Sequence, residues 1–147
     1  MKNKNGFTLI ELLAVIVVIG IVSLVAIPGI MAISNKIKNG NIIDDAKKLV
    51  ALAKYKVNKE NILASRRFSF DELNVNGDLE KDPDGGEYKT AYSYVEYSIY
   101  NDLSSYCVVL IGSKRAVGGY YDCIPEEALQ PDITTDPPEG TPVPIPK

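Results

Sequence analysis

The chain opens with a long apolar run that is followed by amphipathic and alternating patterns. From Leu12 to Asn35 no side chain carries a charge. At about 1.5 Å per residue, a helix of this length covers roughly 36 Å, which exceeds a hydrocarbon core of about 30 Å. The pattern therefore predicts a membrane-spanning helix from near Phe7. We expect a kink or a melted turn just before Pro28, because proline removes a helical hydrogen bond.

The pattern becomes amphipathic from Ile33 onward, where apolar residues recur at spacings of three and four with lysines mostly between them. The apolar positions are Ile43, Ala46, Val50, Ala53 and Val57. This spacing predicts one apolar stripe on a basic helix, and we interpret it as the face on which a folded head packs. The segment Asn39–Asn41 weakens the helix because it contains Gly40. The helix should fray or stop around Asn58 to Ala64.

Three later runs have the composition of β-strands. They are Tyr92–Tyr100, Cys107–Ile111 and Ala116–Cys123, and Gly112–Arg115 is the expected turn of a hairpin. The cysteines would then lie near the open end of that hairpin. The segment Arg66–Asp84 reads as a loop rich in turn signals, with Phe68, Phe70 and Leu73 as its anchors to the core. These patterns predict an α+β fold, in which a long N-terminal helix packs on a small antiparallel β-sheet.

The first residues resemble a known processing signal. Lys2 and Lys4 precede the sequence GFTLIE, which runs from Gly6 to Glu11. This arrangement is similar to the cleavage and methylation signature of type IV pilins and pseudopilins. The resemblance implies the type IV pilin fold, cleavage after Gly6 by a prepilin peptidase, N-methylation of Phe7, and a role in assembly for Glu11. It is strong as far as Pro28 and nearly absent beyond about Asn61.

The position of Glu11 agrees with that resemblance on physical grounds. A carboxylate in an apolar helix is costly in a membrane unless it is paired, and cleavage would create a cationic amine one helical turn away. Glu11 could then neutralise the amine of a neighbouring helix. The alternative is an ordinary signal peptide or a single-pass anchor. That alternative is disfavoured because the apolar run is long, no Ala-x-Ala site follows it, and an anchor has no use for Glu11.

The chain divides into five predicted segments. They are a leader at 1–6, an apolar membrane and assembly helix at 7–33, an amphipathic helix half at 34–61, a globular head at 62–129 and a proline-rich tail at 130–147. The tail has prolines at 131, 137, 138, 142, 144 and 146. We expect it to be disordered or to form polyproline II helix, because this composition cannot build a core.

Charge is distributed unevenly along the chain. Residues 36–67 contain nine basic and three acidic side chains, whereas residues 68–147 contain five basic and fifteen acidic ones. We interpret the basic helix face and the acidic head as solvated surfaces, with electrostatic packing between subunits as the alternative. Binding of nucleic acid by the basic helix is not assigned, because its apolar stripe is needed for the head.

The two cysteines, Cys107 and Cys123, both follow the apolar helix. Lys2 and Lys4 on the other side of that helix place the amino terminus in the cytoplasm and the head outside, where disulfides persist. We therefore expect a disulfide between them. The alternative of a reactive thiol pair lacks the Cys-x-x-Cys spacing and any histidine partner.

An acidic run between Asp78 and Glu87 offers oxygen ligands. Calcium near Asp78, Asp82 and Asp84 is possible, and an Asp-Pro-x-Gly stretch before a tyrosine is similar to one in secretion pseudopilins, some of which bind calcium nearby. The spacing does not fit an EF-hand loop. We favour turn chemistry on an acidic surface, with no metal and no cofactor.

The sequence predicts a structural subunit and no enzyme, because it has no nucleophile with a base, no phosphate-binding glycine loop and no metal-ligand cluster. The resemblance implies that the chain assembles with copies of itself into a helical homopolymer, and that its other partners are other pilins, a prepilin peptidase and a pilus assembly platform. It implies that the filament supports adhesion, motility or DNA uptake. The protein would lie in the cytoplasmic membrane before assembly and in an extracellular filament afterwards. The alternatives are a minor pilin, a pseudopilin of a secretion or competence filament, and a membrane-anchored binding protein that never polymerises.

Overall fold

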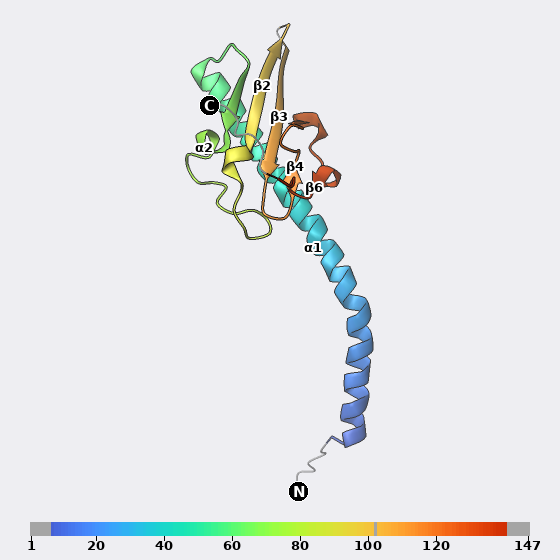
Figure 1. Cartoon of the computed structure of the whole chain (residues 1–147). Helices are drawn as coiled ribbons and strands as arrows, with labels where there is room; N and C mark the ends of the chain where they lie inside the picture. Colours follow the sequence, from blue (N-terminus) through green and yellow to red (C-terminus); the bar gives the residue numbers. More distant parts are fainter. Residues whose placement is uncertain (1–6, 102, 141–147) are drawn as a thin grey trace. The chain divides into compact units, whose positions relative to one another are not determined.

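The computed structural model describes residues 7–101 and 103–140. The chain forms two compact units, one up to Lys36 and the other from Ile37 onward. The helix α1, Leu9–Glu60, provides the first unit and the first element of the second (Figure 1). The expected α+β fold is confirmed, because the part of α1 that follows Ile37 packs on a small antiparallel sheet.

The apolar part of α1 is exposed at almost every residue whose side chain the structure describes. Of the described residues, α1 is the one helix with the length and composition to cross a membrane. It begins at Leu9, two residues after the expected start, and it continues through Pro28. The expected melted turn before Pro28 is therefore wrong: the helical hydrogen bonds on either side of one missing N–H keep the backbone helical.

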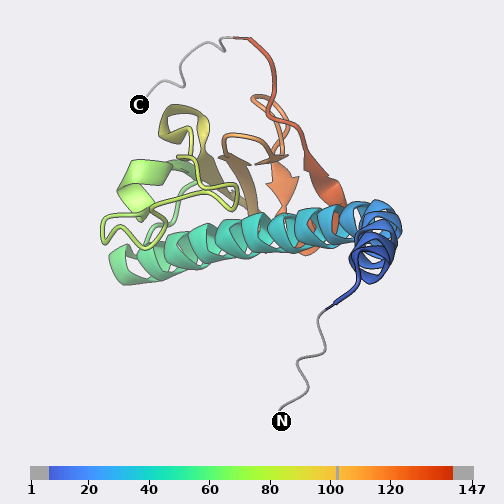
Figure 2. The same cartoon turned by 90° about the horizontal axis from the view of Figure 1, so that it is seen from below.

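The sheet contains six short strands in the order β1-β2-β3-β4-β6, with β5 beside β3, and every pairing is antiparallel. The strands are β1 Arg66–Ser69, β2 Tyr94–Tyr100, β3 Leu103–Ile111, β4 Ala116–Val117, β5 Ile124–Pro125 and β6 Thr134–Thr135. Short helices connect them: α2 Phe70–Leu73, η1 Thr90–Tyr92, η2 Glu126–Ala128 and η3 Pro131–Ile133. Within residues 37–140, the sheet lies along one side of α1 (Figure 2).

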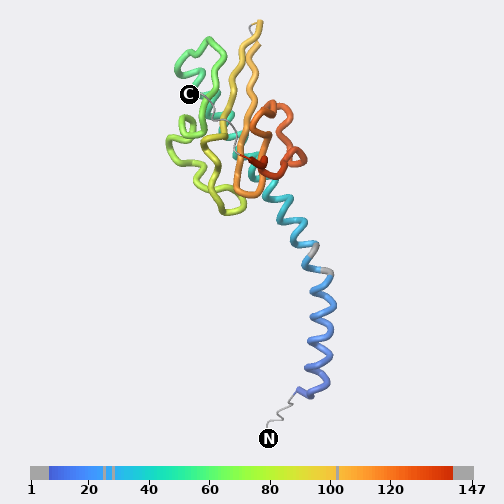
Figure 3. Tube along the Cα trace, in the orientation of Figure 1, coloured from blue at the N-terminus to red at the C-terminus, as the bar shows by residue number. Residues whose placement is uncertain are grey.

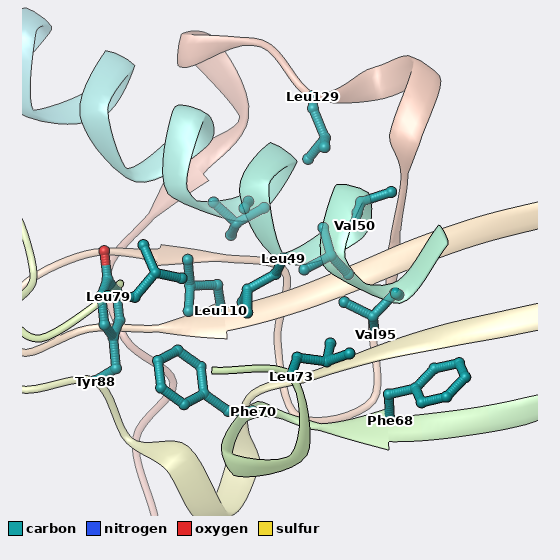
Figure 4. Close-up of a cluster of buried hydrophobic side chains, with 14 of the residues drawn as sticks. Leu49, Val50, Phe68, Phe70, Leu73, Leu79, Tyr88, Val95, Leu110 and Leu129 are labelled. Carbon is teal, nitrogen blue, oxygen red and sulfur yellow. The ribbon is translucent and has the colours of Figure 1, made fainter. Parts of the chain in front are cut away.

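The core lies between α1 and the inner face of the sheet (Figure 4). The five predicted stripe residues are all buried, and Ile42 and Leu49 join them. From the sheet come Val95 and Tyr97, which are buried in this core and lie on either side of the half-buried Glu96. The predicted anchors Phe68, Phe70 and Leu73 are also buried in this core.

Two predicted segments differ from the structure. The expected loop Arg66–Asp84 begins with β1 and α2, because Arg66–Ser69 pairs with β2 in spite of its polar residues. The third expected strand keeps only Ala116–Val117, since Gly118 has a φ of 76° and turns the chain toward Asp122.

The described part of the predicted tail belongs to the head, so its expected disorder is wrong there. Thr134–Thr135 forms β6 beside β4, and Ile133 packs against the core. The hydroxyl of Tyr120 lies 3.2 Å from the carbonyl oxygens of Pro138 and of Gly140. Figure 3 traces this segment, in orange to red, beside the sheet. Residues 141–147 lie outside the described part of the chain.

Candidate functional site

The candidate site is the first turn of α1, and Thr8 and Glu11 build it together. Thr8 precedes the first helical residue, so it occupies the N-cap position, and Glu11 is the third residue of the helix. The Thr8 N–H donates to Oε2 of Glu11 at 2.8 Å, and the Glu11 N–H donates to the Thr8 hydroxyl at 3.4 Å. This reciprocal arrangement is a capping box, which satisfies two N–H groups that a helix start otherwise leaves open.

The same carboxylate oxygen accepts a second hydrogen bond from the Thr8 hydroxyl, at 2.9 Å. Oε1 of Glu11 has no hydrogen-bond partner within residues 7–101 and 103–140. Glu11 is exposed, and its neighbours Ile10 and Leu12 are 74% and 60% exposed. The acid is therefore held by its own helix at one oxygen, and its side chain is exposed among apolar neighbours. A cation from another molecule could reach it there.

The predicted cleavage residues lie just before this turn. Phe7 is 81% exposed and is not helical. Gly6 lies outside the described residues, so its cleavage stays a prediction. The described backbone of Phe7 and Thr8 is thus non-helical up to the cap, and it places the predicted new amine two residues before Leu9.

The helix α1 continues through Pro28, where a break was predicted. The side chain of Pro28 lies outside the described part of the chain. Nearby, the Ser23 hydroxyl donates to the carbonyl of Ile19 at 2.8 Å, so this polar group is satisfied within the helix. A Cβ at Gly20 or at Gly29 would meet nothing within 4 Å. These glycines are not required by packing within a single chain.

The acidic residues proposed as calcium ligands have other partners. Asp82 is 4% exposed, and it accepts backbone N–H groups from Asp84, Gly86 and Ser113. Burial alone would raise the pKa of Asp82, but these hydrogen bonds outweigh it and the pKa is lowered. Asp78 is exposed. Among the described residues, no group of three or more His, Cys, Asp or Glu side chains is arranged to hold a metal ion.

Asp84 pairs with Arg115, a contact that sequence reasoning did not anticipate. The Arg115 Nε lies 2.5 Å from Oδ2 of Asp84, and Lys38 Nζ lies 3.0 Å from Oδ1. The hydrogen bond from Arg115 lowers the pKa of Asp84 to about 2, although burial opposes this, and Lys38 adds to the effect. Because these residues are distant in sequence, no local pattern could indicate the pairing.

Cys107 and Cys123 form a disulfide with a Cα–Cα distance of 5.5 Å. Cys107 lies in the middle of β3 rather than at its start, because β3 begins at Leu103. Cys123 directly precedes β5, which pairs with β3 at Cys107 and Val108. The bond therefore joins the C-terminal segment to the central strand of the sheet, rather than closing the open end of a hairpin.

The Thr8–Glu11 pair could have been found in the sequence. The spacing Thr-x-x-Glu before an apolar run is the signature of a capping box. Sequence reasoning assigned Glu11 to assembly and gave no role to Thr8. The structure adds an intramolecular role for Glu11 that does not depend on other subunits.

Comparison with known proteins agrees with the motif at the amino terminus. Residues 1–27 match the family model described as the prokaryotic N-terminal methylation motif. No curated protein and no solved structure matches the chain. The motif indicates a type IV pilin-like or pseudopilin subunit, which is a structural type of protein, and with the apolar helix it indicates anchoring in a membrane. Over its first 27 residues, this chain therefore carries the type IV prepilin-like signal motif.

Proposed function

We propose that this protein is a structural subunit of a type IV pilus filament. A prepilin peptidase cuts the chain after Gly6 and methylates the amine of Phe7. The mature subunit resides in the cytoplasmic membrane with its amino terminus on the cytoplasmic side. A pilus assembly platform then adds it to a filament of identical subunits and other pilins. The filament serves adhesion, motility or DNA uptake.

The observation that carries this proposal is the exposed apolar helix with the exposed carboxylate of Glu11 in its first turn. An exposed apolar surface of this length needs a partner, which is lipid before assembly and the helices of other subunits afterwards. The carboxylate then meets the cationic amine of a neighbour, because both charges are costly when they are unpaired in an apolar medium. Each subunit supplies one of each charge, so the contact can repeat along a polymer.

Intact mass spectrometry of sheared surface filaments tests the proposal. We expect a subunit that begins at Phe7 and carries one added methyl group. Replacing Gly6 by a bulky residue, in Gly6→Leu, should leave an uncut precursor in the membrane. Gly20→Ala is the control, because it changes a glycine of α1, away from the cleavage site, where a Cβ has open space around it. Absence of the protein from filaments, or a mature chain that begins after Pro28, would contradict the proposal.

A further inference from the structure

The helix α1 crosses a segment that is poorly suited to a helix. Asn39, Gly40 and Asn41 follow one another, and glycine and asparagine rank among the weaker helix formers. Packing does not require the glycine, because a Cβ at Gly40 would meet nothing within 4 Å. The buried core of the head begins just afterwards at Ile42. The helical state of residues 39–41 therefore needs support from contacts other than its own backbone and the core.

Two side chains at this weak segment are held by one ion pair. Lys38 Nζ contacts Oδ1 of Asp84 at 3.0 Å, and Asn39 Oδ1 accepts a hydrogen bond from Nη1 of Arg115. Arg115 also donates two hydrogen bonds to the Asp84 carboxylate, from Nε at 2.5 Å and from Nη2 at 3.0 Å. The Asp84 side chain is 3% exposed and that of Arg115 is 11% exposed, so solvent screens this pair little.

The two segments that carry the ion pair are hydrogen-bonded to each other through Asp82. Asp82 accepts N–H groups of its own loop, from Asp84 at 2.9 Å and Gly86 at 2.8 Å, and a third from Ser113 at 2.5 Å in the turn between β3 and β4. A Cβ at Gly86 would lie 2.6 Å from the Ser113 side chain, so the close approach of loop and turn depends on that glycine. The loop at 82–86 and the turn at 112–115 therefore form one platform.

We propose that the Asp84–Arg115 pair is a latch that keeps α1 helical across residues 39–41, and that opening the latch turns this segment into a hinge. The latch acts on the side chains of Lys38 and Asn39, directly before the glycine. The core holds the helix from Ile42 onward, so the segment is fixed on both sides while the latch is closed. This inference does not depend on the proposed function, since it concerns the chain from Lys38 onward and not the polymer.

Amide hydrogen exchange on the full-length protein in detergent micelles tests the latch. In Asp84→Asn, which removes the charge of the pair, exchange of amides 39–43 should rise at least about tenfold more than exchange of amides 46–57, which rises only as far as the whole head is destabilised. Adding Gly40→Ala should restore much of the lost protection, because alanine strengthens the helix where the latch no longer does and its Cβ has room. Glu126→Gln is the matched control, since it breaks the pair with Lys54 on the same helix.

Three results would overturn the inference. One is unchanged exchange of amides 39–43 in Asp84→Asn. Another is an equal rise over amides 39–57, which would mean that the whole head has been loosened. The third is a failure of Gly40→Ala to slow exchange in the Asp84→Asn background, because the pair would then hold the loop and not the helix.

Discussion

At the scale of single residues, Thr8 and Glu11 together order the start of α1. The capping box occupies Oε2 of Glu11 and orders the first turn of α1. In the proposed assembly the amine of a neighbour approaches the same carboxylate. The cap therefore presents the acid in one place, and it gives Thr8 a positioning role.

Removal of the Thr8 hydroxyl should loosen this first turn. In Thr8→Ala the side-chain cap is lost, so exchange of the amides of Glu11 and Leu12, which donate to the hydroxyl and the carbonyl of residue 8, should rise by about tenfold in detergent micelles. Thr8→Ser keeps a hydroxyl and should exchange as the original chain does. Equal exchange in Thr8→Ala and Thr8→Ser would show that the hydroxyl does not order the turn.

The lowered pKa of Asp84 makes the free energy of unfolding of the head depend on pH at the acidic end of the scale. Its pKa is lowered from 3.8 to about 2 in the folded chain, so the folded state holds the charged form more tightly than the unfolded state does. The resulting stability is present above pH 3.8 and is lost as the pH falls through about 2. At pH 7 it amounts to about 2 kcal/mol.

Unfolding of Asp84→Asn, followed by tyrosine fluorescence in detergent, tests this estimate. The variant should lose about 2 kcal/mol of unfolding free energy at pH 7, and the difference from the original chain should shrink between pH 4 and pH 2. Glu80→Gln, at an exposed acid, should show no such trend. A deficit that stays constant from pH 7 to pH 2 would mean that the lost interaction is not that of the charged carboxylate.

At the scale of elements, the disulfide holds a segment whose strand is too short to form many contacts. Strand β5 has two residues, and the bond ties it to β3 across a sequence separation of 16. Cys107→Ser with Cys123→Ser should lower the unfolding free energy by about 2 to 5 kcal/mol. Denaturant titration measures this, and a reductant should have the same effect on the original chain but none on the double variant. A loss well below 1 kcal/mol would assign the stability of this segment to packing alone.

Local patterns predicted the elements that depend on local sequence. The apolar stripe of α1 was correct because helical spacing places its residues on one face, and the run Tyr92–Tyr100 was correctly predicted to contain a strand. Strand β1 was missed because Arg66–Ser69 has little strand character of its own and forms through pairing with β2. Its outward arginines are stabilised by partners such as Glu96, which are distant in sequence.

The C-terminal segment was missed for a related reason. Its prolines suggested disorder, yet Thr134–Thr135 completes the sheet beside β4, and Pro137 and Pro138 are partly buried. Proline lacks an N–H but still packs and still accepts hydrogen bonds, as Pro138 does near Tyr120. The composition therefore indicated that the segment has few backbone N–H donors, but it could not indicate that β4 and Tyr120 would pair and pack with it.

At the scale of the whole molecule, the signal that comparison matches covers only the start of the chain. The match to the methylation motif ends at residue 27, and the head has no match among curated proteins or solved structures. The predicted role in assembly therefore rests on the first turns of α1, while the use of the filament depends on a head that comparison does not explain. The most direct test must act on the helix.

Two variants of Glu11 separate the cap from the charge. Glu11→Gln keeps an oxygen that can accept the Thr8 N–H, so the capping box survives, but it cannot neutralise an amine. Glu11→Ala removes both the oxygen and the charge. Neither change hinders insertion into a membrane, because each removes a charged group from an apolar helix. A protein that is only anchored should therefore accumulate normally with either substitution.

The decisive measurement is the amount of each variant in sheared filaments relative to the amount in membranes. The account predicts that both variants are cut after Gly6 and reach the membrane, and that incorporation of each falls below about a tenth of the original level, since the neighbour's amine is left unpaired. Normal incorporation of Glu11→Gln would contradict the account, because it would show that the charge of Glu11 is not required for assembly.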